Sequence, residues 1–181
     1  QKNKDADNDS NYAMLKSLEL SKEDHFNLIK ECDLHGIEFF STGFDIESLS
    51  FLLELKMNRI KIPSGEITNL PFLEHIAKFN LPVILSTGMA DILEIEHALD
   101  VLLGNKLVKS NLSILHCTSL YPAPFETINL NVIPALKQKF KINIGYSDHT
   151  LGIEAAIAAV SLGAQIIEKH ITMDVSMPGP D

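Results

Sequence analysis

Residues 142–170, INIGYSDHTLGIEAAIAAVSLGAQIIEKH, contain the pattern that decides the fold class. Two short runs rich in β-branched residues, 142–147 and 165–171, stand on either side of a small, apolar stretch at 152–162. Apolar runs of this length predict buried parallel strands. The stretch between them ends at Gly163 and predicts a buried helix. The segment therefore predicts one strand–helix–strand unit with parallel strands.

The same unit repeats along the chain. Four further strand candidates lie at 38–41, 59–62, 82–86 and 112–118, and the six start about 25 residues apart on average, which is close to the ~30 residues per unit of an eight-unit barrel. Helices with clear ends are expected between or before them. Their signals are Ser21 with Asp24 and Gly36, Pro71 within 69–80, and Asp91 with Glu94 and Gly104.

Repeated parallel β/α units fit either an open doubly wound sheet or a closed barrel. No strand is followed by G-x-G-x-x-G and there is no P-loop, so the usual marker of a nucleotide-binding open sheet is missing. Hydroxyl, carboxylate or imidazole groups follow all six strands instead, which is typical of the catalytic face of a barrel. We therefore predict an α/β fold of the TIM (β/α)8 type, with about six of its eight units in this chain.

Composition bounds the function. The 181 residues include 15 Lys+Arg and 24 Asp+Glu, a net charge of −9, which argues against sequence-independent nucleic-acid binding. No apolar run approaches the ~18 residues of a membrane span. Cys32 and Cys117 lie far apart without a C-x-x-C motif and no signal peptide is evident, which favours reduced thiols and a cytoplasmic location. Residues 1–13 are expected to be a polar, mobile segment before a catalytic domain at 14–181.

Two histidines at matched strand ends suggest a metal site. In 145–149 the alternation of side chains puts Ser147 and His149 on one face, and in 167–170 it puts Glu168 and His170 together. Because the two strands are neighbours, both imidazoles can reach one first-row divalent ion. A single histidine would more often be a satisfied core residue, but two at matched ends favour a catalytic metal with open positions.

Other strand ends carry groups suited to an anionic substrate. Lys61 could pair with an anion or form a Schiff base, and Glu66 could act as a general base or bind a sugar hydroxyl. Five hydroxyls reach the same rim and could hold a phosphate or carboxylate: Thr42, Ser64, Ser86, Ser119 and Ser147. Each hydroxyl alone could equally begin a turn. Tyr121 could stack on a sugar ring or cover the core.

Six motifs, taken together, resemble the bacterial sialic acid synthase family, which includes N-acetylneuraminate and legionaminic acid synthases. They are KIPSGE (61–66), ILSTGM (84–89), HCTSLYPAPFE (116–126), GYSDHTLG (145–152), IEKH (167–170) and PGPD (178–181). The resemblance implies a TIM barrel followed by an antifreeze-like domain, in a homodimer. The implied reaction condenses phosphoenolpyruvate with an N-acetylmannosamine-type sugar to a nine-carbon 2-keto acid and phosphate, with Mn or Mg.

The resemblance also implies roles for individual residues. His149 and His170 correspond to metal ligands, and Glu66 is expected to handle protons, with Glu168 second. The phosphoenolpyruvate site would comprise Lys61, Thr42, Ser64, Ser86 and Ser147, and the sugar contacts Glu66, Tyr121 and Asp181. Ser119 stands where sialic-acid-forming members can have Asn. The family's first two strands and its antifreeze-like domain are expected to be absent from this chain.

Two alternatives stay open. One is an aldolase that forms a Schiff base at Lys61, which borohydride trapping with pyruvate would reveal. The other is a truncated barrel that is inactive or only binds sugar, because losing two strands exposes two sheet edges.

Overall fold

The computed structural model describes residues 12–13, 16–174 and 176–177. The chain divides into two compact units, one formed by Gln1–Phe39 with Thr172–Asp181 and the other by Phe40–Ile171. In the first unit, helix α2 (Lys22–Leu34) has the predicted capping box between Ser21 and Asp24. Most of the expected polar segment 1–13, and Asp181, lie outside the described residues. In the part of the chain described, no helix is long and apolar enough to cross a membrane.

The second unit, Phe40–Ile171, contains a five-stranded sheet. Its strands are β1 (Ile60–Ile62), β2 (Val83–Ser86), β3 (Leu112–Cys117), β4 (Asn143–Asp148) and β5 (Ile167–Lys169). All neighbouring strands are parallel and their order follows the sequence, β1-β2-β3-β4-β5. This order is the one found in a β/α barrel, whereas a doubly wound sheet reverses direction at a switch point.

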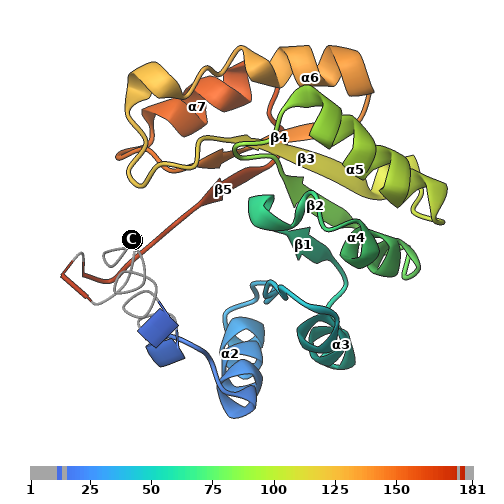
Figure 1. Cartoon of the computed structure of the whole chain (residues 1–181). Coiled ribbons are helices and arrows are strands. Elements are labelled where there is room, and N and C mark those ends of the chain that lie inside the picture. The colour runs from blue at the N-terminus through green and yellow to red at the C-terminus, as the bar shows by residue number, and fades with distance from the viewer. Residues whose placement is uncertain (1–11, 14–15, 175, 178–181) are drawn as a thin grey trace, which may run out of the picture. The chain divides into compact units, whose positions relative to one another are not determined.

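The helices of this unit follow the strands in turn. α3 (Ile46–Glu54) precedes β1, and α4 (Leu70–Ala77), α5 (Ile92–Gly104), α6 (Val132–Phe140) and α7 (Glu154–Ser161) connect successive strands. Short 3-10 helices lie at η1 (Ser64–Glu66), η2 (Lys109–Asn111) and η3 (Phe125–Thr127). Figure 1 shows α4 to α7 on one side of the strands. A parallel sheet with its connecting helices on one side is part of a barrel rather than an open sandwich of layers.

The alternation of side chains along the strands separates two faces. The face toward the helices is apolar and joins the core, through residues such as Ile62, Leu85, Ile114 and Ile144. The opposite face, which we call the lumen face, carries Lys61, Ser86, Cys117, Ser147 and Glu168, at the positions between. The polar candidates therefore share one face because the strands are in register, with Cys117 beside Ser147 and Ser147 beside Glu168.

The sheet is strongly curved, as a contact between its two edge strands shows. Lys61 on β1 and Glu168 on β5 form an ion pair, with Nζ and Oε2 3.1 Å apart. In a flat sheet these strands would be about 19 Å apart, four spacings of ~4.8 Å, which is too far for the two side chains to meet. The pair therefore shows that the sheet curls around its lumen face into a half-barrel.

One predicted strand is wrong. Residues 38–41 form no strand, so the described part of the chain has five strands rather than six. A strand requires a hydrogen-bonded neighbour, and the ladder of β1 runs only to β2. Phe40 in this segment is exposed. The other five predicted strands are confirmed with ends shifted by two residues or fewer.

The helix at 152–162 is confirmed, as α7, but its predicted burial is wrong. Only Ala155 and Ala159 in it are buried, while Ile157 is 62% exposed and Val160 55%. The reason is that α7 lies on the strands with a narrow alanine face, so its larger side chains point away from them. The other predicted helix starts are confirmed: Asn69 caps α4 with Pro71 in its first turn, and Asp91 forms a capping box with Glu94 at α5. The helix predicted at 69–80 ends earlier, at Ala77.

Candidate active site

Two imidazoles lie together just beyond the carboxyl ends of β4 and β5. His149 directly follows β4 and His170 directly follows β5. Their ring centroids are 5.2 Å apart, with 57° between the ring planes. Both histidines therefore occupy the arrangement that the strand ends predicted. We refer to them as the imidazole pair.

The ring of His149 is oriented by the backbone. Its Nδ1 lies 2.7 Å from the carbonyl oxygen of Thr118, and a carbonyl only accepts, so the ring proton is placed on Nδ1. This tautomer leaves a lone pair on Nε2, which is 3.3 Å from the hydroxyl of Ser147. A hydrogen bond from one ring nitrogen to a carbonyl is the usual support of a histidine that binds metal through the other nitrogen.

The ring of Tyr121 packs against both imidazoles. Its ring centroid is 4.1 Å from that of His149 and 5.5 Å from that of His170, with the planes inclined by 30° and 28°. The loop that carries it is tied to the site, because the backbone N–H of Ala123 donates to the carbonyl of His149. Tyr121 is itself 53% exposed, so its outer face is open to a ligand.

Beside the imidazole pair lies a network of Lys61, Glu168 and Ser147. The Ser147 hydroxyl donates to Glu168 Oε1 over 2.7 Å, and Glu168 Oε2 pairs with Lys61. Lys61 is 8% exposed, which makes it a nearly buried ammonium held by one carboxylate. Because Ser147 also lies next to His149, the network connects Lys61 with the imidazole pair.

A second group of side chains lies at the ends of β1, β2 and β3. The backbone N–H of Gly88 donates to Ser64 Oγ over 2.8 Å, and Ser64 Oγ is 3.4 Å from Cys117 Sγ. A Cβ on Gly88 would collide with Ser64 and Ser119 and would lie 3.0 Å from Cys117 Sγ. Only glycine allows this close approach, which packs both hydroxyls and the thiol around one backbone position.

Ser86 supplies a hydroxyl that has no partner within the described structure. It is 3% exposed, and its Oγ makes no hydrogen bond to any described residue. A buried polar group without a partner costs about 1–3 kcal/mol. An oxygen of a bound ligand would remove that cost, so Ser86 is suited to anion binding.

The remaining candidates are placed differently. Glu66 accepts a hydrogen bond from the side-chain amide of Asn69 over 2.7 Å, at the start of α4. Among the described residues, no hydrogen bond joins Thr42 to the groups above. Asp181 is outside the described residues. Of the two predicted proton-handling carboxylates, Glu168 is therefore the one in contact with the lysine and serine of the site.

An ion pair on the other face ties β4 to β5, and the sequence interpretation missed it. Lys169 Nζ lies 2.8 Å from Asp148 Oδ2, and Thr150 donates its hydroxyl to Asp148 Oδ1 over 2.7 Å. Burial alone would raise the pKa of Asp148, but the hydrogen bonds from Lys169 and Thr150 outweigh it and hold that pKa below its ordinary value. The pair holds the ends of the two strands that carry the imidazole pair. The side-chain alternation that places His149 and Glu168 on the lumen face also places Asp148 and Lys169 together on the opposite face. This pair could therefore have been predicted from the sequence.

Two aromatic groups behind the site are kept uncharged. Burial, followed by the nearby Asp148 carboxylate, raises the pKa of Tyr146 to about 12. Burial lowers the pKa of His116, although its hydrogen bond to the Ile128 carbonyl opposes this. His116 packs beside Tyr146, with ring centroids 5.8 Å apart.

The imidazole pair fits a divalent metal. Metal–nitrogen bonds are about 2 Å long, so rings that share an ion must lie within a few ångströms of each other, which a centroid separation of 5.2 Å allows. Within the described residues, no group of three or more His, Cys, Asp or Glu is placed to hold a metal ion. The described part of the chain thus offers two imidazoles to such an ion.

A half-barrel with a lysine, a carboxylate and paired imidazoles at its strand ends belongs to the class of β/α-barrel enzyme sites. The chain itself belongs to the NeuB family, whose model matches residues 1–181. It is 51% identical to N,N'-diacetyllegionaminic acid synthase from Legionella pneumophila over 184 residues and 52% identical to the enzyme of that name from Campylobacter jejuni over 176 residues.

A solved structure supports the fold. The N-acetylneuraminic acid synthetase of Leptospira borgpetersenii, in complex with citrate, matches with a TM-score of 0.85 and 40% identity, over 90% of this chain and 56% of that one. The chain covers 100% and 97% of its own length in the two synthase matches but only 51% and 53% of theirs. It therefore spans about half the length of these relatives.

Proposed function

We propose that this chain forms the catalytic half-barrel of a nonulosonic acid synthase. The reaction condenses phosphoenolpyruvate with an N-acetylmannosamine-type sugar to give a nine-carbon 2-keto acid, sialic or legionaminic, and phosphate. The observation that carries the proposal is the imidazole pair, 5.2 Å apart, beside the Lys61–Glu168–Ser147 network at the strand ends. Two of its relatives are named N,N'-diacetyllegionaminic acid synthase, which supports the assignment.

Phosphoenolpyruvate would bind between Lys61 and the hydroxyls. A nearly buried ammonium favours an anionic partner, and the unpartnered hydroxyl of Ser86 and those of Ser64 and Ser147 are donors at the same strand ends. Thr42 stays in this site because the family resemblance implies it, since the strand predicted before it at 38–41 does not form. Because Glu168 forms an ion pair with Lys61, phosphoenolpyruvate would have to share the Lys61 ammonium with Glu168 or displace that carboxylate.

The sugar would bind on the side of Tyr121 and the imidazole pair, with Glu66 and Asp181 as further contacts implied by the family motifs. His149 and His170 would hold Mn or Mg, whose chemistry there is to polarise the aldehyde oxygen as a Lewis acid. Stacking of Tyr121 on both rings would fix their orientation and shield them on one side.

Bond formation would join C3 of phosphoenolpyruvate to the aldehyde carbon, using the electron pair of the enol double bond. The aldehyde oxygen becomes a hydroxyl by taking a proton. Water then adds to the cationic C2 and loses one proton, which gives a hemiketal phosphate. The C2–O bond to phosphate then breaks while the remaining hydroxyl proton passes to the departing phosphate, which leaves the ketone and inorganic phosphate. We assign proton transfer to Glu168 before Glu66, because Glu168 is within hydrogen-bond distance of Ser147 and pairs with Lys61.

The test is a phosphate-release assay on the full chain with phosphoenolpyruvate and Mn²⁺. N-acetylmannosamine and its 6-deoxy diacetamido analogue should be compared as substrates. We expect sugar-dependent phosphate release with one of them and loss of release with EDTA. Release that is independent of sugar would contradict the proposal, and so would its absence with both sugars in a protein of the relatives' full length.

A Schiff-base aldolase is the second candidate, because Lys61 is a nearly buried amine on the lumen face. Borohydride reduction in the presence of pyruvate would attach pyruvate covalently to Lys61 in that case. We expect mass spectrometry to find no adduct. The homodimer and the choice between Mn and Mg stay predictions of the family resemblance, and the cytoplasmic location stays a prediction from the cysteine content.

A further inference from the structure

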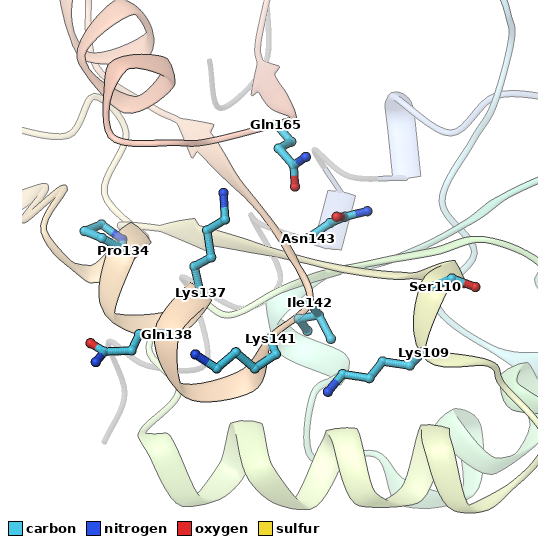
Figure 2. A pocket seen from close by; sticks show the side chains of 9 residues that line it. All are labelled: Lys109, Ser110, Pro134, Lys137, Gln138, Lys141, Ile142, Asn143 and Gln165. Atoms are coloured by element: carbon cyan, nitrogen blue, oxygen red, sulfur yellow. The ribbon is translucent and has the colours of Figure 1, made fainter.

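A basic hollow lies at the other ends of the strands, away from the candidate active site. It has a volume of about 780 Å³ and is lined by Lys109, Ser110, Pro134, Lys137, Gln138, Lys141, Ile142, Asn143 and Gln165 (Figure 2). These residues lie at the start of β3, in and after α6, at the start of β4 and before β5. The six residues of β4 separate the hollow from His149, about 20 Å at 3.3 Å per residue. We call this hollow the basic pocket.

The charge of the basic pocket is opposite to that of the protein. The chain carries a net charge of −9, yet the nine lining residues include three lysines and neither Asp nor Glu. Among the described residues, no carboxylate forms an ion pair with Lys109, Lys137 or Lys141. Lys139, which points elsewhere on α6, does pair with Glu96, over 2.6 Å. The three ammonium groups in the pocket are therefore not neutralised by the described chain.

The three lysines come from separate positions. Lys137 extends from α6 toward the turn before β5, where its Nζ would lie 3.5 Å from a Cβ placed on Gly163. Lys141 caps α6 in the left-handed conformation, at φ 54° and ψ 41°, where glycine is the usual residue. A helix C-terminus attracts nearby cations, which would explain lysines on α6. It does not explain Lys109, which lies on η2 before β3.

We propose that the basic pocket binds a small anion that carries two or more phosphate groups. Three ammonium groups suit such a charge, and the neutral side chains of Gln138, Asn143 and Gln165 add hydrogen-bond donors. The volume falls in the range of small-molecule sites, about 300–1,000 Å³. A nucleic acid is a poorer fit, because the net charge of −9 repels a long polyanion. This site is independent of the proposed synthase activity.

Inorganic pyrophosphate is the probe for the test, titrated into the full chain at constant ionic strength and followed by amide NMR. The signals of Ser110, Gln138 and Gln165 should shift and saturate, whereas binding at the candidate active site would shift those of Ser64 and Ser147. The pocket variant replaces Lys109, Lys137 and Lys141 with Gln. The matched control replaces the exposed Lys56, Lys78 and Lys106 with Gln, which removes the same charge elsewhere.

We expect the pocket variant to bind pyrophosphate at least tenfold more weakly at the pocket signals and the control variant to bind within about twofold of the unchanged protein. Equal weakening in both variants would overturn the proposal, because it would show attraction to net charge alone. Shifts that do not saturate, or shifts confined to Ser64 and Ser147, would overturn it too. Circular dichroism spectra of both variants verify that the fold is kept.

Discussion

At the residue scale, the Glu168 carboxylate contacts two neighbouring side chains. One oxygen accepts the Ser147 hydroxyl and the other pairs with Lys61, so any change in the charge of Glu168 alters both contacts. Glu66 has the same chemistry but is bound to Asn69 at the start of α4. The family motifs identify both residues, but Glu168 lies on β5 and Glu66 on the short helix η1, so their surroundings differ.

This difference predicts the effects of two matched substitutions. Glu168→Gln should lower kcat for phosphate release by at least 100-fold, because the residue that we assign to proton transfer is lost. Glu66→Gln should act mainly on the KM for the sugar, since Glu66 is a proposed sugar contact that does not touch Lys61. Steady-state kinetics of the two variants measure this. A larger loss of kcat in Glu66→Gln would reverse the assignment.

At the scale of the elements, β4 and β5 are joined behind the site by the pair of Asp148 and Lys169. The carboxylate is fully buried, and its pKa lies below the ordinary value because Lys169 and Thr150 donate to it. A group whose pKa is lowered by folding stabilises the protein above its unfolded pKa, near 4, and loses that contribution as the pH falls through the folded pKa. The strand ends that carry both histidines therefore depend on a charged Asp148.

Lys169→Met tests this linkage. We expect it to lower the free energy of unfolding by about 3 kcal/mol at pH 7, because it leaves a buried carboxylate without its cation. The difference from the unchanged protein should shrink as the pH falls below 4, where Asp148 is protonated in the unfolded chain. Urea unfolding followed by circular dichroism at several pH values measures it.

Lys139→Met is the control for Lys169→Met, since its pair with Glu96 is half exposed. It should lower the free energy of unfolding by less than about 1 kcal/mol, both at pH 7 and below pH 4. If the two variants lose similar stability, or if the loss in Lys169→Met grows on acidification, the role of Asp148 is wrong.

At the scale of the whole molecule, the described sheet has two free edges and an exposed apolar surface. β1 and β5 have one neighbour each, and Ile157 and Val160 on α7 are more than half exposed. Edge strands and apolar patches of this kind promote association between chains. We therefore expect the chain of 181 residues to self-associate as its concentration rises.

Charged substitutions on α7 test that expectation. Ile157→Lys combined with Val160→Lys should reduce the mean mass measured by light scattering at high protein concentration. Leu93→Lys is the control, because Leu93 is equally exposed, at 63%, but lies on α5. A monomeric unchanged chain at all concentrations would contradict the prediction, as would an equal effect of Leu93→Lys.

Much of the fold could be predicted because short apolar runs and capping residues are local signals. The pairing of His149 with His170 was also predictable, since it needs only the alternation of side chains and the order of two neighbouring strands. The strand predicted at 38–41 was wrong because a β-like run forms a strand only if a neighbouring strand is present to pair with it. The contact of Lys61 with Glu168, the stacking of Tyr121 and the basic pocket depend on how the sheet curves, which no local pattern encodes.

The most direct test of the central claim is pulsed electron paramagnetic resonance of the chain loaded with Mn²⁺. We predict nitrogen couplings from two imidazoles, reduced to one in His149→Ala and in His170→Ala, with metal-dependent phosphate release lost in both while circular dichroism stays unchanged. Mn²⁺ that shows no nitrogen coupling, or a spectrum and turnover unaffected by either substitution, would contradict the assignment of this pair as the metal site.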